Sequence, residues 1–193
     1  SPASAEITKL ALNCFVTMKI AYCNSIGDLA DATKDANSQQ ILAAIGFDSR
    51  IGSKCMRPGY GFGGPCFPRD NRALGSYAKS IGQDPLLMNA TDESNDQHRE
   101  RQIKQLLKKF DIEDELLFKE VTYKPNCPVP IIEQSQKLMI AAELARAGRK
   151  ITICDREDVL DAVKREYGYL FKYKVWNEDD SSLLQGFQLV EEN

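Results

Sequence analysis

The chain has 193 residues, of which 42% are hydrophobic and 27% are charged, and its formal net charge is −3. This length allows one or two domains with a substantial hydrophobic core, and the composition is typical of a globular protein. The small negative charge argues against general binding to nucleic acid or membrane surfaces, and no run of about 18 apolar residues indicates a membrane span.

The first half of the sequence predicts helices. From residue 4 to about 32, apolar residues recur at spacings of three and four, Ser1 or Ser4 can cap the start, and Glu6 is placed in the first turn. The expected apolar positions are Ile7, Leu10, Ala11, Cys14, Phe15, Met18 and Ala21. Further helices are expected over 37–45, ended by Gly46, over 69–81, ended by Gly82, and over 85–110. Residues 47–68 are expected to be irregular.

The second half alternates short apolar runs with helical stretches. Strands are expected over 116–123, 151–154, 172–176 and 187–190, and helices over 133–147 and 157–166. Such alternation implies a parallel sheet. We therefore predict a helical domain over residues 1–112, followed over 113–193 by a small α/β domain that resembles half of a nucleotide-binding fold.

The cysteines and the single histidine limit the possible chemistry. The six cysteines are Cys14, Cys23, Cys55, Cys66, Cys127 and Cys154. They form no C-x-x-C pair, so with one histidine in the chain we expect no zinc site and no other metal site. Their scatter predicts free thiols and a cytoplasmic protein. His98 lies in a charged run over 92–101, which predicts a solvated helix face without a catalytic task.

The sequence over residues 59–70, GYGFGGPCFPRD, is the strongest candidate site. Glycines allow backbone to approach a ligand closely, and Cys66 follows them where a helix is expected to begin, a position that favours thiolate. Asp70 would lie in the first turn of that helix. The pattern predicts covalent catalysis by Cys66 with Asp70 as a carboxylate base. The alternative is that Cys66 is a small buried hydrophobic residue.

Other polar residues can join this site. Lys9 and Asn13 lie four residues apart and so share one helix face, where a cation and an amide can stabilise an oxyanion. Alternatively, they mark a helix edge that faces solvent. Arg50, Lys54 and Arg57 bring positive charge near the glycines, which suits either phosphate binding or an ordinary charged surface.

Four blocks of the sequence resemble the UDP-glucose/GDP-mannose dehydrogenase family in their order and spacing. The blocks are Ser4–Asn13 (SAEITKLALN), Arg50–Gly52 (RIG), Gly61–Asp70 (GFGGPCFPRD) and Tyr123–Asn126 (YKPN). The resemblance implies a helical dimerisation domain followed by a Rossmann-like α/β domain. It also implies oxidation of a nucleotide-sugar alcohol to a carboxylate in two NAD⁺-dependent steps, with UDP-glucose as the default substrate and GDP-mannose or UDP-N-acetyl sugars as alternatives.

The resemblance assigns roles to individual residues. Cys66 would form a thiohemiacetal and then a thioester, Asp70 would help activate water, and Lys9 and Asn13 would steady oxyanions and the water. The residues implied in substrate binding are Arg50, Arg57, Tyr60, Gly61, Phe62, Gly63, Gly64, Phe67 and Lys124. Arg50 would reach the partner subunit's site in a homodimer built on the long N-terminal helix. Arg69 is the one residue implied in binding the NAD cofactor.

The glycines at 59–64 lead to Cys66 instead of following a strand and entering a helix, so they are not the family's G-x-G-x-x-G fingerprint for NAD. We therefore expect the NAD-binding domain to be absent and the chain alone to be inactive. The sequence around Lys124 also departs from the family pattern. Two alternatives remain. The chain could act as a non-catalytic module that dimerises and binds nucleotide sugars. It could also be an unrelated thiol enzyme such as a transferase, which the lack of a histidine near Cys66 disfavours.

Overall fold

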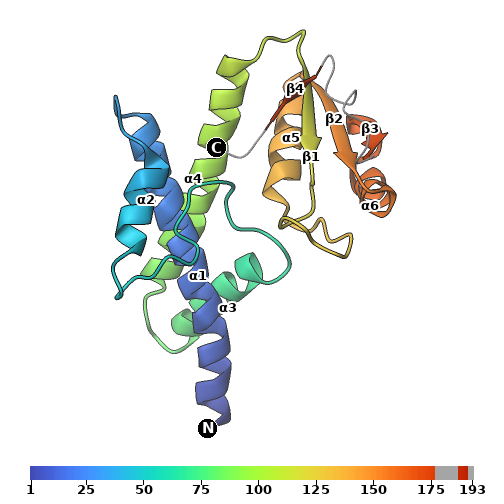
Figure 1. Ribbon diagram of the computed structural model, residues 1–193. Helices are drawn as coiled ribbons and strands as arrows, with labels where there is room; N and C mark the ends of the chain where they lie inside the picture. The colour runs from blue at the N-terminus through green and yellow to red at the C-terminus, as the bar shows by residue number, and fades with distance from the viewer. Residues whose placement is uncertain (177–186, 191–193) are drawn as a thin grey trace. The chain divides into compact units, whose positions relative to one another are not determined.

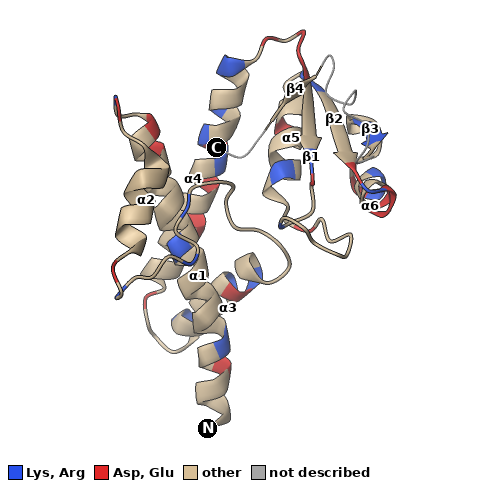
Figure 2. Cartoon of the chain, in the orientation of Figure 1, with Lys and Arg blue, Asp and Glu red and all other residues tan. Residues whose placement is uncertain are grey.

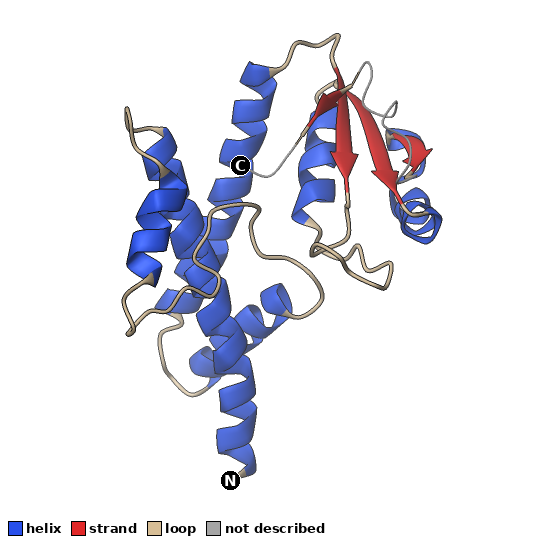
Figure 3. Ribbon diagram, viewed as in Figure 1, coloured by secondary structure: helices blue, strands red, loops and turns tan. Residues whose placement is uncertain are grey.

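The computed structural model describes residues 1–176 and 187–190. They form two compact units, the first from Ser1 to Arg99 and the second from Glu100 onward. The fold class predicted from the sequence is confirmed: the first unit is built from helices and loops, and the second is an α/β unit with a parallel sheet (Figures 1 and 3). The division falls within a long helix, and the domain boundary at residue 112 stays a prediction.

The helices that contribute to the first unit are α1 (Pro2–Asp31), α2 (Ser38–Gly46), α3 (Phe67–Ser80) and the first part of α4 (Leu86–Lys109). Helix α1 begins where the Ser1 side chain accepts a hydrogen bond from the Ser4 backbone N–H at 3.3 Å. Because the helix starts at Pro2, Glu6 lies beyond the first turn, contrary to the prediction.

Two glycines expected to follow helix ends behave differently. Gly46 is the last residue of α2 instead of the residue after it. It is buried, and a Cβ atom at this position would lie only 3.1 Å from the Cα of Ser53. Gly82 follows α3 as predicted. Its φ of 75° is the left-handed conformation that glycine allows, and the N–H of Gln83 then bonds to the carbonyl of Ala78 at 2.9 Å.

The apolar face predicted for α1 is partly wrong. Cys14 and Ala21 are buried, but Ile7 and Phe15 are 41% and 59% exposed. Helix α1 carries apolar residues around most of its circumference, so spacing alone does not decide which side packs inside. Exposed large side chains recur along one face at spacings of three, seven and seven residues, and we call them the α1 stripe: Leu12, Phe15, Tyr22 and Leu29.

The second unit is a four-stranded parallel sheet with the order β3-β2-β1-β4. Its elements are β1 (Glu115–Lys119), α5 (Gln136–Arg146), β2 (Lys150–Asp155), α6 (Glu157–Tyr167), the 3₁₀ turn η1 (Gly168–Leu170), β3 (Lys172–Val175) and β4 (Gln188–Leu189). Helices α5 and α6 both pack against β2. The middle residues of β1 and β2 are buried on both faces, as is typical of parallel strands covered by helices.

Two elements of the second unit have an end that lies three or more residues inside the predicted range. The strand expected over 116–123 ends at Lys119, because Glu120 adopts a φ of 51° that interrupts the extended backbone. The helix expected over 133–147 begins only at Gln136, after Ser135 caps it by accepting the N–H of Leu138. Both differences depend on single backbone conformations, which hydrophobic spacing does not reveal.

Lys and Arg residues are interspersed with Asp and Glu residues along the helices of both units other than α2 (Figure 2). In the part of the chain that the structure describes, no helix is both long and apolar enough to cross a membrane.

Candidate active site

Cys66 lies immediately before the first residue of α3 and is exposed. Its carbonyl oxygen accepts the backbone N–H of Asp70 at 2.8 Å, which closes the first turn of the helix. The exposure contradicts the alternative in which Cys66 is a buried hydrophobic residue. The thiol is therefore accessible at the start of a helix.

Asp70 is the centre of a charged cluster beside Cys66. Its side chain is 3% exposed, although the cations that pair with it are largely exposed. The Oδ2 atom accepts hydrogen bonds from the Lys9 ammonium and, at 2.6 Å, from the Asn13 amide. The Oδ1 atom accepts two from the Arg69 guanidinium, each at 3.2 Å. Lys9, Asn13 and Asp70 are therefore brought together as the sequence predicted.

These contacts set the protonation of Asp70. Burial of the carboxyl group opposes its ionisation, but the hydrogen bonds from Lys9, Asn13 and Arg69 outweigh burial and lower its pKa below the ordinary value. Asp70 is consequently held as a carboxylate and is a weaker base than an unpaired aspartate. Its geometry suits the positioning of Lys9 and Asn13 better than proton abstraction.

The packing of α1 against α3 explains why the cluster forms. Lys9 and Asn13 are separated by one helical turn of α1, so both face the start of α3. Cys14, the next residue on α1, is buried and its thiol donates a hydrogen bond to the carbonyl oxygen of Asp70 at 3.7 Å. Side-chain and backbone contacts thus fix Asp70 from the same helix.

Two buried asparagines hold the glycine-rich segment, and sequence reasoning missed both. Asn24 on α1 accepts the N–H of Gly59 at 2.9 Å and donates to the carbonyl of Tyr60 at 3.3 Å. Asn95 on α4 accepts the N–H of Phe62 at 2.8 Å and donates to its carbonyl at 3.1 Å. A carboxamide can satisfy one donor and one acceptor of a peptide backbone together, and this is its use here.

The solvated position predicted for His98 is wrong. The side chain is buried, with Nδ1 2.9 Å from the carboxylate of Asp28 on α1 and Nε2 2.8 Å from the carbonyl oxygen of Gly59. The charged residues around it in sequence lie on other sides of α4. The signal that marks Asn95 and His98 is their spacing of three residues, which places two polar side chains on the same helix face.

The other residues implied in substrate binding differ widely in exposure. Phe62, Gly63 and Gly64 are buried, Tyr60, Gly61 and Phe67 are partly buried, and Arg50 and Arg57 are exposed. Arg50 forms a two-pronged ion pair with Asp48, with contacts of 2.9 Å and 2.6 Å. The exposed arginines remain accessible to a phosphate or a second chain, whereas the glycine-rich backbone is fixed by its own helices.

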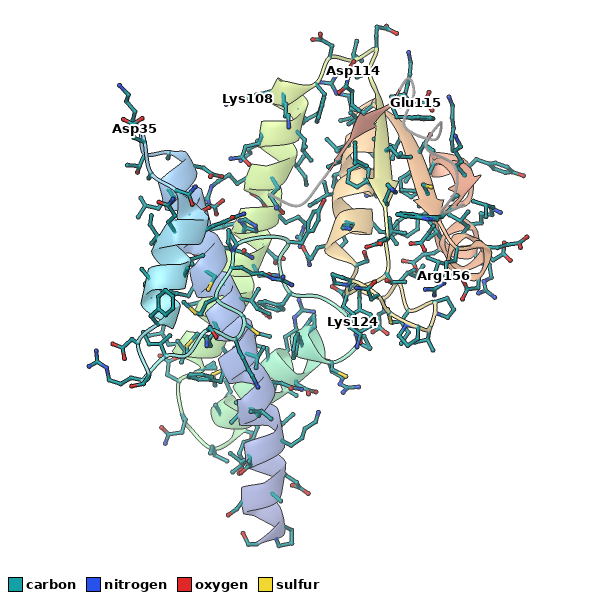
Figure 4. All side chains as sticks on the ribbon, viewed as in Figure 1. Asp35, Lys108, Asp114, Glu115, Lys124 and Arg156 are labelled. Atoms are coloured by element: carbon teal, nitrogen blue, oxygen red, sulfur yellow. The ribbon has the colours of Figure 1, made fainter. Side chains whose placement is uncertain are left out.

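Lys124 belongs to the second unit, in the loop after β1 (Figure 4). Its ammonium lies 5.4 Å from the ring centre of Tyr123, and this tyrosine raises the pKa of Lys124. Arg156, which follows β2, donates to the carbonyl of Cys127 in the same loop at 3.0 Å. Since β1 lies between β2 and β4, the chain order reverses there, and ligands of parallel sheets bind at the carboxyl ends of strands at such points.

The described residues do not by themselves fit a dinucleotide. The segment from Glu120 to Ser135, between β1 and α5, contains no glycine that would let a backbone approach a pyrophosphate. Arg69, the one residue implied in NAD binding, has its guanidinium engaged with Asp70. Among the described residues, no three His, Cys, Asp or Glu side chains gather as a metal site requires.

Comparisons with known proteins agree with this geometry. Residues 3–97 match the family model described as the UDP-glucose/GDP-mannose dehydrogenase family, central domain. Over 152 residues the chain is 34% identical to a UDP-glucose 6-dehydrogenase of Haloferax volcanii, covering 77% of this chain and 34% of the relative. It is 32% identical over 164 residues to a UDP-glucose 6-dehydrogenase of Rhizobium meliloti, covering 83% of this chain and 37% of the relative.

Among solved structures, the chain is similar to a UDP-glucose dehydrogenase from the hyperthermophilic archaeon Pyrobaculum islandicum. The TM-score is 0.84 at 26% sequence identity, and the match covers 98% of this chain and 43% of the other. The chain thus spans about a third of the length of the curated relatives just described and under half of this solved structure.

Proposed function

This chain belongs to the UDP-glucose/GDP-mannose dehydrogenase family, and we propose that it provides the substrate-oxidising half of a nucleotide-sugar 6-dehydrogenase. The observation that carries the proposal is the cluster of Lys9, Asn13 and Arg69 around the carboxylate of Asp70, directly beside an exposed cysteine at a helix start. UDP-glucose is the favoured substrate, because the relatives described above are UDP-glucose dehydrogenases, and the protein acts in the cytoplasm.

Cys66 is the nucleophile in this proposal. After the alcohol has been oxidised to the aldehyde, the thiolate adds to the carbonyl carbon and forms a thiohemiacetal. Loss of a second hydride yields a thioester, and water then releases the acid and restores the thiol. The family's hydride acceptor in both oxidations is NAD⁺, and the residues of this chain would position the nucleotide sugar for it.

Lys9 and Asn13 would stabilise negative charge on the substrate oxygen when Cys66 adds and when water attacks the thioester. Asp70 orients both side chains through its Oδ2 atom, and its lowered pKa keeps it charged while it does so. Asp70 therefore acts on the attacking water chiefly by ordering the groups around it. In the first unit the backbone of residues 59–64 would bind the nucleotide sugar, and Lys124 of the second unit stays a predicted substrate-binding residue.

A chimera tests the proposed activity. The NAD-binding part of the Haloferax volcanii relative is joined ahead of Ser1, and NADH formation is measured with UDP-glucose, GDP-mannose and UDP-N-acetylmannosamine in turn. We expect oxidation of one of these substrates, with two NADH formed per acid, and none by the 193-residue chain alone. A folded chimera that binds NAD⁺ but oxidises none of the three would contradict the proposal.

The α1 stripe supports a second, compatible function, which is homodimerisation. Four exposed large apolar side chains on one helix face are costly to leave in water, and a heptad-like spacing lets two copies of α1 pack against one another. In such a dimer the exposed Arg50 would reach the partner's site. A chain that dimerises and binds nucleotide sugars without oxidising them remains the alternative function.

We expect the chain to sediment as a dimer at micromolar concentration and Phe15→Glu to sediment as a monomer, because the substitution would place a charge within the apolar stripe. Tyr169→Glu is the matched control, since Tyr169 is fully exposed in the second unit and does not belong to the stripe. A monomeric parent chain, or a Phe15→Glu variant that stays dimeric, would rule out this interface.

A further inference from the structure

Three buried side chains on two helices grip one short stretch of backbone four residues before the nucleophile. Asn24 is 2%, Asn95 5% and His98 7% exposed. Together they bond to the backbone N–H and carbonyl of Gly59, the carbonyl of Tyr60, and both polar groups of Phe62. We call these three side chains the loop brace.

His98 also links the loop to α1. Its Nε2 atom faces a carbonyl oxygen, which only accepts, so this nitrogen carries a hydrogen and donates to Gly59. Its Nδ1 atom is bonded to the carboxylate of Asp28, which fixes the ring between α1 and α4. The ring cannot rotate to release Gly59 without also breaking the contact to Asp28.

The side chain of Asn95 also explains one of the glycines. A Cβ atom on Gly61 would lie 2.4 Å from Oδ1 of Asn95, far inside van der Waals contact. Gly61 is therefore required by the brace itself and not only by a ligand. Similarly, a Cβ atom on Gly27 of α1 would lie 2.8 Å from Cβ of Pro58. Helix α1 therefore needs a glycine where Pro58, the residue before the braced stretch, packs against it.

We propose that Asn24, Asn95 and His98 are positioning residues for the reaction: by fixing the backbone of Gly59–Phe62 they set the orientation of the Cys66 thiol. The inference rests on the proposed function, because it gives the brace a task at the nucleophile. Cys66 is exposed when the brace is intact, and we infer that the brace keeps the thiol presented to reagents and substrate. It controls the direction in which the thiol points from the start of α3.

The rate of alkylation of Cys66 by iodoacetamide tests this in the 193-residue chain, without any oxidation assay. Cys55 is the internal standard, since it is also exposed but precedes the braced stretch. We expect Asn95→Ala and His98→Ala to slow Cys66 by about fivefold, the factor that corresponds to one lost hydrogen bond. Cys55 should keep its rate. His98→Gln should restore most of the Cys66 rate, because its amide can still donate to Gly59.

Ser94→Ala is the matched control on α4. The hydroxyl of Ser94 bonds to that of Ser25 on α1 and does not touch the loop, so Cys66 and Cys55 should both react as in the parent chain. A purely structural effect would expose the buried Cys14 and Cys23 to alkylation as well. If Asn95→Ala exposes Cys14 and Cys23, the comparison of His98→Ala with His98→Gln tests the inference instead. A slow Cys66 in His98→Ala and a recovered rate in His98→Gln would support it, whereas equal Cys66 rates in the two variants would contradict it.

Gly61→Ala provides a second measurement. In the parent chain the new Cβ atom collides with Asn95 and should slow Cys66, whereas in the Asn95→Ala background it should add little, because the colliding atoms are gone. Additive effects of the two substitutions would contradict the steric coupling.

Faster hydrogen exchange over residues 59–62 with unchanged Cys66 alkylation would overturn the inference, since the brace would then stabilise the loop alone. An inactive chimera in which the brace variants still slow Cys66 would overturn the proposed oxidation and leave the inference standing.

Discussion

Cys66→Ser is expected to lower acid formation by roughly three orders of magnitude or more in a chimera that carries an NAD-binding domain, as removal of a covalent nucleophile does. A serine hydroxyl is not appreciably ionised near neutral pH, and the structure places no histidine beside residue 66 that could activate it, because His98 is bound to Asp28 and Gly59. The measurement is uronic acid and NADH formed per enzyme under identical conditions.

Cys55→Ser is the matched control for this result. Cys55 is the other exposed cysteine of the chain, and its thiol belongs to no part of the proposed site. We expect its activity to stay close to that of the parent. A test without turnover is also available, because the aldehyde-level nucleotide sugar should protect Cys66, but not Cys55, from iodoacetamide. Acid formation by Cys66→Ser at the parent rate would exclude the thioester route.

The residues of this site were predictable from the sequence because the signals are local. Lys9 and Asn13 are one helical turn apart, and Cys66 and Asp70 flank a predicted helix start, so each pair is placed by its own segment. Family resemblance then joined the two segments. The same reasoning predicted the parallel sheet, since alternating strands and helices leave few other topologies.

The loop brace could not be predicted in this way. The side chains of Asn24, Asn95 and His98 form hydrogen bonds with backbone atoms 33 to 39 positions away in the chain. Because backbone groups are the same in nearly every residue, the sequence does not reveal these partners. His98 was misassigned because its sequence neighbours are charged, although a helix can bury one polar side chain while its neighbours face solvent. The exposure of Phe15 was not predicted for the opposite reason, because exposed and buried faces of α1 are both apolar.

Asp70→Asn is expected to lower oxidation by about a hundredfold, in line with the loss of an orienting charge in an electrostatically organised site. The substitution keeps the size of the side chain but removes the charge that holds Lys9 and Arg69, and its amide nitrogen cannot accept the bonds that one carboxylate oxygen accepts now. Since hydrogen bonds to charged groups contribute about 1.5–3 kcal/mol, the free energy of unfolding should fall by about 2 kcal/mol at pH 7.

This stability difference should depend on pH in one direction. The folded-state pKa of Asp70 is lowered, so its stabilising contribution is fully present above the unfolded value of about 3.9 and is lost as the pH falls through the lower, folded-state value. Urea unfolding of the parent and of Asp70→Asn should therefore differ at pH 7 and converge below that window. At acid pH the parent carboxyl group is protonated and no longer pairs with the cations.

Asp92→Asn separates the catalytic part of this effect from the structural part. Asp92 on α4 likewise bridges an arginine and an asparagine, at 3.0 Å from Arg72 and 2.9 Å from Asn71, but it contacts neither Lys9 nor Asn13. Both variants should lose stability, whereas only Asp70→Asn should lose turnover. Equal losses of turnover would mean that any weakening of the helix packing slows the enzyme, and Asp70 would then be a structural carboxylate without a specific task at Cys66.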